Sequence, residues 1–218
     1  MVWLLNYYPV YLKLDGKKCL VVGGGKVAER KVRSILEAGA RVYVVSPVLT
    51  NWLEEAAAMG TVTVIRRNYT TTDLENAFLV IGATDVPVIN SRVARDCHDR
   101  NILVNIVDSP ADCNFIVPSV FRQGSLSISI STDGKSPMLA RRIREELEME
   151  FGPEYHEFLE LMCDLREHII RNVPDEEQRR HMFKELVYSD IIQLLKDGQR
   201  EKVKERISYV LGNSWTQS

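Results

Sequence analysis

The chain has 218 residues, of which 45% are hydrophobic and 27% are charged, and its formal net charge is −2. These values are ordinary for a globular protein with one large core and a smaller module. A nearly neutral chain has no long-range field that would draw it to nucleic acid or to an anionic membrane, and no run approaches the ~20 apolar residues of a membrane span. We therefore expect neither partner.

The cysteines and histidines give no sign of a bound metal. The four cysteines, at positions 19, 97, 113 and 163, show no Cys-x-x-Cys spacing, and the four histidines form no ligand pattern. Residues 1–9 also lack the basic start and the long apolar stretch of a signal peptide. We therefore expect reduced thiols in a cytoplasmic protein without a metal site.

The first elements form a strand–helix–strand unit. Alternation over Tyr11–Leu14 runs into the turn signal Asp15-Gly16, and the apolar run Cys19–Val22 then predicts a buried strand. A helix follows, closed by Gly39, and Val42–Val45 predicts a second, parallel strand reached by a right-handed connection. The predicted buried face of the helix consists of Val27, Ala28, Val32, Ile35 and Leu36.

The turn between strand and helix carries a dinucleotide fingerprint, G-x-G-x-x-A, at Gly23, Gly25 and Ala28. The first glycine permits a tight turn, the second lets the backbone approach a pyrophosphate, and the alanine lets the helix pack closely on the strand. The helix N-terminus then offers N–H groups to the phosphates. A glycine-rich turn without a ligand is the alternative, but the strand–turn–helix context favours a nucleotide site.

The end of the second strand lacks one expected feature. NAD-binding units usually carry an acidic residue there for the ribose hydroxyls, whereas this chain has Ser46-Pro47-Val48. No arginine follows immediately to favour a 2′-phosphate either. The residues alone therefore leave NAD and NADP both open.

The chain continues with alternating helices and strands as far as about residue 112. Helices are predicted over Asn51–Met59 and Pro87–Arg100, with a turn and helix cap near Thr70–Asp73. Strands are predicted over Val62–Arg66, Phe78–Ile81 and Ile102–Val107. This alternation predicts an α/β fold, a Rossmann-like doubly wound parallel sheet.

A hairpin is predicted next, from Phe115–Phe121 and Ser125–Ser131. Pro118 falls inside the first run, which places it at an edge or a bulge. A two-stranded unit must pack on something, and both a subunit interface and the chain's own helices remain open. Helices are then predicted over Ser136–Phe151, Tyr155–Asn172, Asp175–Asp197 and Glu201–Leu211. We therefore expect three parts: residues 1–112, residues 113–150 and a helical domain at residues 151–218.

Two carboxylates follow strands of the predicted sheet, where α/β proteins bind their ligands. Asp85 comes after the strand that ends near Gly82, and Asp108 comes after Ile102–Val107. A carboxylate beside a nicotinamide can accept a proton as hydride leaves the substrate. The alternatives are turn formation at Asp108 and the start of a helix after Asp85.

A second candidate site lies at the start of the predicted helix at 136–151, where Ser136 and Pro137 provide capping chemistry. Cations near a helix start oppose the helix dipole by roughly 0.3–1 kcal/mol each, so Lys135, Arg141 and Arg142 suggest an anionic partner. A polycarboxylate or a phosphate would suit them. Pairing with the glutamates at 145, 146 and 148 is the alternative.

These motifs together resemble the precorrin-2 dehydrogenase family, the NAD-dependent module of siroheme synthases. The matching stretches span about residues 7–150: 8–14 (YPVYLKL), 21–31 (VVGGGKVAERK), 83–85 (ATD), 105–108 (NIVD), 115–119 (FIVPS) and 131–141 (STDGKSPMLAR). Residues 151–218 match in helical character and length only. A chain of 218 residues also leads us to expect no methyltransferase module.

The resemblance implies NAD-dependent oxidation of precorrin-2 to sirohydrochlorin by a homodimer whose subunits meet through about residues 113–147. It implies that Asp108 is catalytic and assists proton removal. The predicted cofactor-binding residues are Gly23, Gly25, Lys26, Val27, Ser46, Pro47, Val48, Thr84 and Asp85. The predicted contacts to the tetrapyrrole are Asn105, Ser131, Thr132, Lys135, Arg141 and Arg142. Two alternatives stay open: an enzyme that also inserts Fe²⁺ or Co²⁺ into sirohydrochlorin, and a non-catalytic NAD(H)-sensing module.

Overall fold

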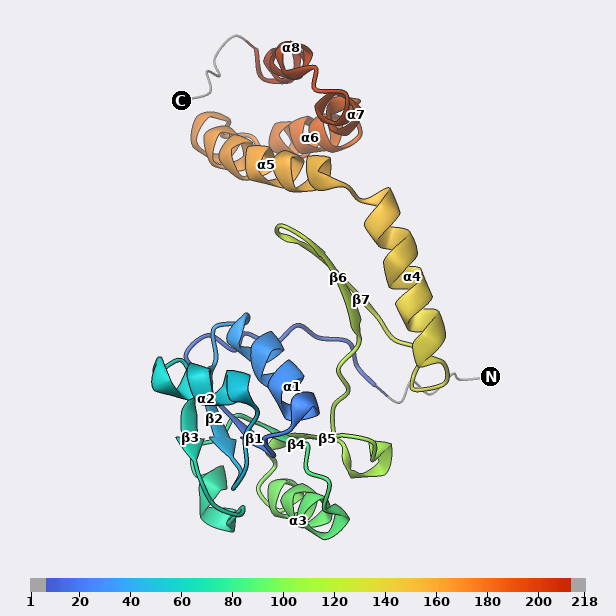
Figure 1. Cartoon of the computed structure of the whole chain (residues 1–218). Coiled ribbons are helices and arrows are strands. Elements are labelled where there is room, and N and C mark those ends of the chain that lie inside the picture. Colours follow the sequence, from blue (N-terminus) through green and yellow to red (C-terminus); the bar gives the residue numbers. More distant parts are fainter. Residues whose placement is uncertain (1–6, 213–218) are drawn as a thin grey trace, which may run out of the picture. The chain divides into compact units, whose positions relative to one another are not determined.

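A computed structural model describes residues 7–212 of the chain (Figure 1). The chain divides into two compact units, one up to Val117 and one from Pro118 onward. The expected three-part division at residues 112 and 150 stays a prediction. Residues 1–6, which carry most of the stretch considered for a signal peptide, lie outside the described residues.

The first unit is built on a five-stranded parallel sheet, which confirms the predicted fold class. Its strands are β1 (Lys18–Val22), β2 (Arg41–Val45), β3 (Thr63–Ile65), β4 (Leu79–Gly82) and β5 (Leu103–Ile106). Their order in the sheet is β3-β2-β1-β4-β5, and every pair is parallel. The chain moves outward from β1 in one direction through β2 and β3 and in the other through β4 and β5. A ligand cleft is therefore expected above the carboxyl ends of β1 and β4.

Helices cover both faces of this sheet (Figure 1). Helices α1 (Lys26–Leu36) and α2 (Asn51–Ala58) share one core with Cys19 and Val21, while α3 (Pro87–His98) shares the other with Leu20 and Val22. Successive side chains of a strand point to opposite faces, so β1 contributes to both cores in turn. Two covered faces explain why these strands are apolar throughout. Short 3₁₀ helices lie at Thr71–Leu74 and Pro110–Asp112.

Helix α1 packs on the sheet through Ala28, Val32 and Ile35, which repeat at helical spacing. Gly39 ends the helix as predicted, with φ +77° and its N–H donating to the Leu36 carbonyl, while the Ala40 N–H donates to Ile35. The prediction was wrong for Val27, whose side chain is 38% exposed. Because Val27 precedes Ala28 by one residue, it is turned about 100° away from the buried face.

The second unit begins with the antiparallel pair β6 (Ser119–Gln123) and β7 (Leu126–Ile130). Pro118 comes before β6, so the prediction that it lies inside the strand was wrong; a residue without an N–H fits better outside the ladder. The hairpin contacts α4 (Pro137–Glu150) and α5 (Pro153–Asn172) of its own unit. The predicted subunit interface is not tested by these contacts.

The remaining helices form a small core of their own. It is made by α5, α6 (Glu176–Val187), α7 (Ile191–Lys196) and α8 (Arg200–Leu211), with Leu165, Leu186 and Ile207 fully buried. The predicted single helix Asp175–Asp197 was wrong, because it breaks at residues 188–190. There the Ser189 hydroxyl donates to the Leu186 carbonyl at 2.7 Å and accepts from the Ile191 N–H at 3.3 Å. Among residues 7–212, none of the helices combines the length and the apolar character required to cross a membrane.

Leu165→Ala tests this helical core. Leu165 is fully buried on α5, so we expect the free energy of unfolding to fall by about 2–5 kcal/mol through lost contacts and a residual cavity. Ile170→Ala on the same helix is the control, because that side chain is 52% exposed. Urea unfolding followed by circular dichroism measures both. An equal loss in the two variants would contradict the assigned core.

Candidate active site

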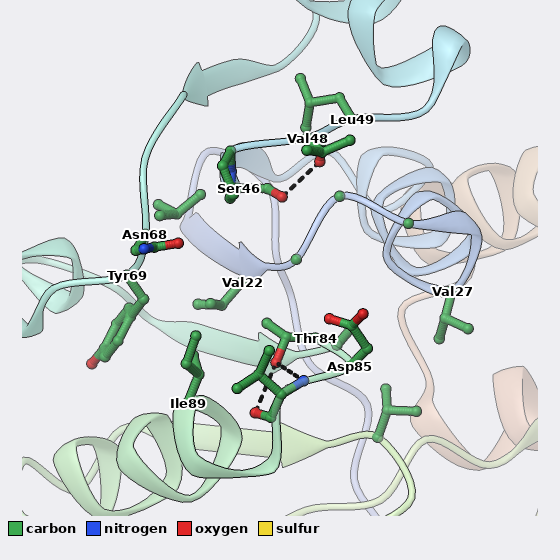
Figure 2. A pocket seen from close by; sticks show the side chains of 18 of the residues that line it. Val22, Val27, Ser46, Val48, Leu49, Asn68, Tyr69, Thr84, Asp85 and Ile89 are labelled. Carbon is green, nitrogen blue, oxygen red and sulfur yellow. Dashed lines mark hydrogen bonds between the residues drawn. The ribbon is translucent and has the colours of Figure 1, made fainter.

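A cavity of about 840 Å³ lies above the carboxyl ends of β1, β2, β4 and β5 in the first unit (Figure 2). Its volume is within the range typical of small-molecule sites. Ten of the residues predicted from the sequence line it: Gly23, Gly25, Lys26, Val27, Ser46, Pro47, Val48, Thr84, Asp85 and Asp108. The parallel strands therefore bring together side chains that are more than 80 positions apart in the sequence.

The glycine loop is held by close backbone contacts on two sides. A Cβ on Gly23, which has φ +122°, would lie 2.3 Å from the Ala83 carbonyl oxygen. One on Gly24, which the sequence analysis did not select, would lie 2.1 Å from the Val48 carbonyl oxygen. Neither position can accept a side chain without moving backbone. Both glycines are thus required by the protein itself.

Gly25 differs from its neighbours. Its φ of −80° is open to any residue, and a Cβ there would meet nothing within 4 Å. It forms the N-cap of α1, where the Glu29 N–H already donates to the Gly25 carbonyl. The N–H groups of the first turn precede that bond and have no intrahelical acceptors, which makes the helix start suited to an anion. The free space beside Gly25 therefore fits a bound pyrophosphate group.

The loop after β2 packs directly on the glycine loop. The Ser46 hydroxyl is buried and donates to the Val48 carbonyl at 2.7 Å, and the Thr50 N–H donates to the Gly24 carbonyl at 2.9 Å. Among the described residues that line the cavity, the carboxylates are Asp85 and Asp108, and neither follows β2. Asn68 follows β3 and directs its carboxamide into the cavity (Figure 2). Asn68 is not among the residues predicted from the sequence, although a polar residue just after a strand of a parallel sheet is a usable signal.

Arg67 also lines the cavity, but its charge is balanced. Its guanidinium makes a two-bond pair with the buried Asp73, at 2.6 and 2.8 Å. Burial alone would raise the pKa of Asp73, but hydrogen bonds from Arg67 and from the Thr70 N–H outweigh it and lower that pKa. Asp73 is therefore ionised at neutral pH and keeps the Arg67 guanidinium paired with its carboxylate.

The loop after β4 presents Thr84 and Asp85 beneath the glycine loop (Figure 2). The carboxamide of Asn90, on α3, accepts from the Thr84 hydroxyl at 2.7 Å and donates to the Thr84 carbonyl at 2.9 Å. This double contact fixes the loop and occupies the Thr84 hydroxyl. Asn90 was not selected from the sequence, because only the fold shows that it faces this loop.

Asp108 follows β5 with a left-handed backbone, at φ +60°. This region is uncommon for residues other than glycine, so a structural reason is expected for it here. Asn105 does not line the cavity formed by the described residues. Its carboxamide donates to the Phe115 carbonyl at 3.1 Å instead.

The other predicted substrate contacts belong to the second unit. The side chains of Ser131 and Thr132 accept from the N–H groups of Asp133 and Ser136, at 3.1 and 3.0 Å. Arg141 pairs with Glu145 and Arg142 pairs with Glu146, both at 2.8 Å along α4. The pairing considered as an alternative in the sequence is therefore present. A role of these residues and of Lys135 toward an anionic ligand stays a prediction.

The thiols and other potential metal ligands are dispersed. All four cysteines are unpaired, and burial raises the pKa of Cys19 to about 11 and that of Cys97 to about 12. These two thiols are therefore poor nucleophiles. Within residues 7–212, no three His, Cys, Asp or Glu side chains gather closely enough to hold a metal ion.

Family models match three successive segments of the chain. A putative NAD(P)-binding model matches residues 10–119, a sirohaem biosynthesis protein central model matches residues 123–149, and a sirohaem synthase dimerisation region matches residues 154–209.

Relatives of known name resemble the chain over nearly its full length. It is 33% identical to the siroheme synthase of Saccharophagus degradans over 210 residues, which is 96% of this chain and 46% of that protein. For the siroheme synthase of Methylobacillus flagellatus the identity is 36% over 203 residues, which cover 93% and 44%. The chain thus spans less than half the length of these relatives. The solved structure of SirC, a precorrin-2 dehydrogenase, is 31% identical with a TM-score of 0.78, and the match covers 94% of this chain and 98% of that one.

Gly25→Val tests the use of the glycine loop. The new side chain would occupy free space, so we expect unchanged thermal stability but at least a tenfold loss of dinucleotide affinity, because the backbone can no longer approach a pyrophosphate. Gly24→Ala is the matched control, and it should lower the melting temperature because its Cβ meets the Val48 carbonyl. Thermal melts and titration with NAD⁺ separate the two effects. Full NAD⁺ affinity in Gly25→Val would refute the assignment.

Proposed function

The chain belongs to the precorrin-2 dehydrogenase family of sirohaem biosynthesis, and we propose that it oxidises precorrin-2 to sirohydrochlorin with NAD⁺. The observation that carries the proposal is that one cavity is lined both by a glycine loop suited to an anion and by Asp108. We further propose that it acts as a homodimer, supported by the match to the sirohaem synthase dimerisation region. Its four unpaired cysteines support a cytoplasmic location.

The cofactor is proposed to lie along the rim of the sheet. The first turn of α1, at Lys26 and Val27, would hold the pyrophosphate, and the loop Ser46–Val48 together with Asn68 would face a ribose. Thr84 and Asp85 would border the nicotinamide half. When bound, the nicotinamide supplies the acceptor for a hydride.

Asp108 is proposed to take the proton that leaves the substrate in the same oxidation. Two hydrogens are lost from precorrin-2, one as hydride and one as a proton, and a carboxylate oxygen of Asp108 accepts the latter. Val107 and Asp108 line the same cavity as the glycine loop, which supports a base at this position. Water would then carry the proton away.

The substrate is a tetrapyrrole with many carboxylates, and we propose that Lys135, Arg141 and Arg142 contact them, with Asn105, Ser131 and Thr132 as polar contacts. The two arginines are more than two-thirds exposed, at 70% and 75% of their side chains. Exposed pairs along a helix contribute little to stability, because water and salt screen them. Exchanging a glutamate partner for a substrate carboxylate therefore costs little.

An anaerobic assay tests the function directly. Incubation of the full chain with precorrin-2 and NAD⁺ should produce NADH, and no growth of the nicotinamide absorbance would overturn the proposal. Gly25→Val serves as the blank. Metal insertion is a separate activity, tested with sirohydrochlorin and Co²⁺ or Fe²⁺; a rate equal to that without protein would eliminate it.

Asp108→Asn should abolish turnover while NAD⁺ binding persists. The amide keeps the size of the side chain but cannot accept the proton, so we expect kcat to fall at least a hundredfold, with the NAD⁺ dissociation constant within about twofold of wild type. Single-turnover absorbance and equilibrium titration measure the two quantities. An unchanged kcat would remove Asp108 from the mechanism.

Asp73→Asn should weaken the preference for NAD⁺ over NADP⁺. The change removes the charge that balances Arg67, and a freed guanidinium lining the cavity would attract a 2′-phosphate. We expect NADP⁺ affinity to rise several-fold, by titration, at little cost to NAD⁺ affinity. Glu54→Gln is the control, because it breaks the neighbouring Arg66–Glu54 pair outside the cavity. NADP⁺ affinity that rises equally in both variants, or in neither, would contradict this reasoning.

A further inference from the structure

We propose that the thiol of Cys113 is a positioning residue that holds Asp108 in its left-handed backbone conformation, and so sets the direction of the carboxylate. The inference rests on the proposed function for its catalytic consequence. Its structural part depends only on contacts within the first unit. We call these contacts, from the Cys113 sulfur to Ile106 and Ser109 across the loop after β5, the brace.

The loop that carries Asp108 is a tight turn. The Ser109 N–H donates to the Ile106 carbonyl at 3.3 Å, so Val107 and Asp108 are its two central residues. Asp108 is the second of these and has φ +60°. Turns with a positive φ at that position favour glycine first, and asparagine or aspartate after it. Aspartate tolerates this conformation but adopts it less readily than glycine, so contacts that hold the turn favour it here.

The Cys113 sulfur contacts this turn at both of its ends. On the side before Asp108, the Ile106 N–H donates to the sulfur at 3.1 Å. On the side after it, the thiol lies 3.2 Å from the Ser109 carbonyl, which is nearer than the Ile106 carbonyl at 3.4 Å, and it can donate its proton to either. Sulfur accepts and donates at longer distances than oxygen does, so these separations are close contacts for a thiol. One side chain thus spans the turn and leaves Asp108 between its two attachment points.

The sulfur itself is held in place by the segment that follows it. The Asn114 N–H donates to the Val104 carbonyl at 3.1 Å, and its carboxamide accepts from the Val104 N–H at 2.7 Å and donates to the Ile102 carbonyl at 2.9 Å. The neighbouring residue therefore pairs with the edge of β5 almost as another strand would. The backbone next to Cys113 is thus held to β5 by three hydrogen bonds of Asn114.

The thiol also keeps its proton. Burial raises the pKa of Cys113, and the hydrogen bond from the Ile106 N–H opposes this only in part. The neutral S–H can therefore act as a donor to Ser109 throughout the neutral range. The Ser109 hydroxyl cannot replace it, because it is bonded to the Asp112 carboxylate at 2.6 Å.

Three variants of the full chain test the brace. In Cys113→Ala we expect kcat for precorrin-2 oxidation to fall about tenfold to a hundredfold, while KM and the NAD⁺ dissociation constant stay within about twofold, because only the acid is misdirected. Cys113→Ser, which keeps a donor and an acceptor, should recover part of kcat. Cys97→Ala is the matched control, since it removes a buried thiol on α3 that lines no part of the cavity.

A second readout does not depend on activity. Amide hydrogen exchange over residues 106–112 should be faster in Cys113→Ala than in wild type or Cys97→Ala. In an Asp108→Gly background, where positive φ is favoured, the stability lost through Cys113→Ala should shrink. If wild type shows no turnover, the proposed function fails while exchange and stability still test the brace. Unchanged exchange, or an equal loss of kcat in Cys97→Ala, would overturn the inference.

Discussion

The close backbone approach at Gly23 and Gly24 is the constraint on which the site depends. Gly23 lies against the loop after β4 and Gly24 lies against the loop after β2, each at a distance that excludes a Cβ. The loops after β1, β2 and β4 therefore lie together at one edge of the sheet, and α1 begins at the space between them. Any side chain at either position would separate these loops and open the cavity, whatever the rest of the chain did.

The site also depends on the edge of the sheet at β5, where the loop that carries Asp108 begins. Among the residues that the structure describes, β5 is the last strand of the sheet and pairs with no further strand at its outer edge. The segment after the 3₁₀ helix at Pro110–Asp112 returns along that edge, and Asn114 takes over the pairing. Asp108 lies in the turn between the strand and this return. Its geometry is therefore set by hydrogen bonds outside the regular sheet, where a small change in the loop would alter it.

Sequence patterns predicted the elements well where burial is strong and periodic. The strands around the glycine loop could be predicted from apolar runs alone, and the helix end at Gly39 could be predicted from turn chemistry. Val27 was misplaced because it lies about 100° around the helix from Ala28, and Pro118 because a residue without an N–H fits better outside the ladder. The break at Ser189 was missed because its cause is one hydroxyl bonding to the backbone. Asn90 and Cys113 could not be found, since their partners lie in loops that only the folded sheet brings near.

The polar side chains that line the cavity divide into two groups, and this division limits where chemistry can occur. Ser46, Thr84 and Arg67 are engaged with protein groups, and so is Tyr69, whose hydroxyl donates to Asp96 at 3.0 Å. The side chains that make no hydrogen bond to the rest of the described chain are Lys26, Asn68, Asp85 and Asp108. A ligand that satisfies them must offer anionic groups near α1, donors or acceptors near β3, and a dissociable proton near β5. The first two conditions are those that the pyrophosphate and a ribose of the proposed dinucleotide would meet, and the third is the one that the proposed oxidation would meet at Asp108.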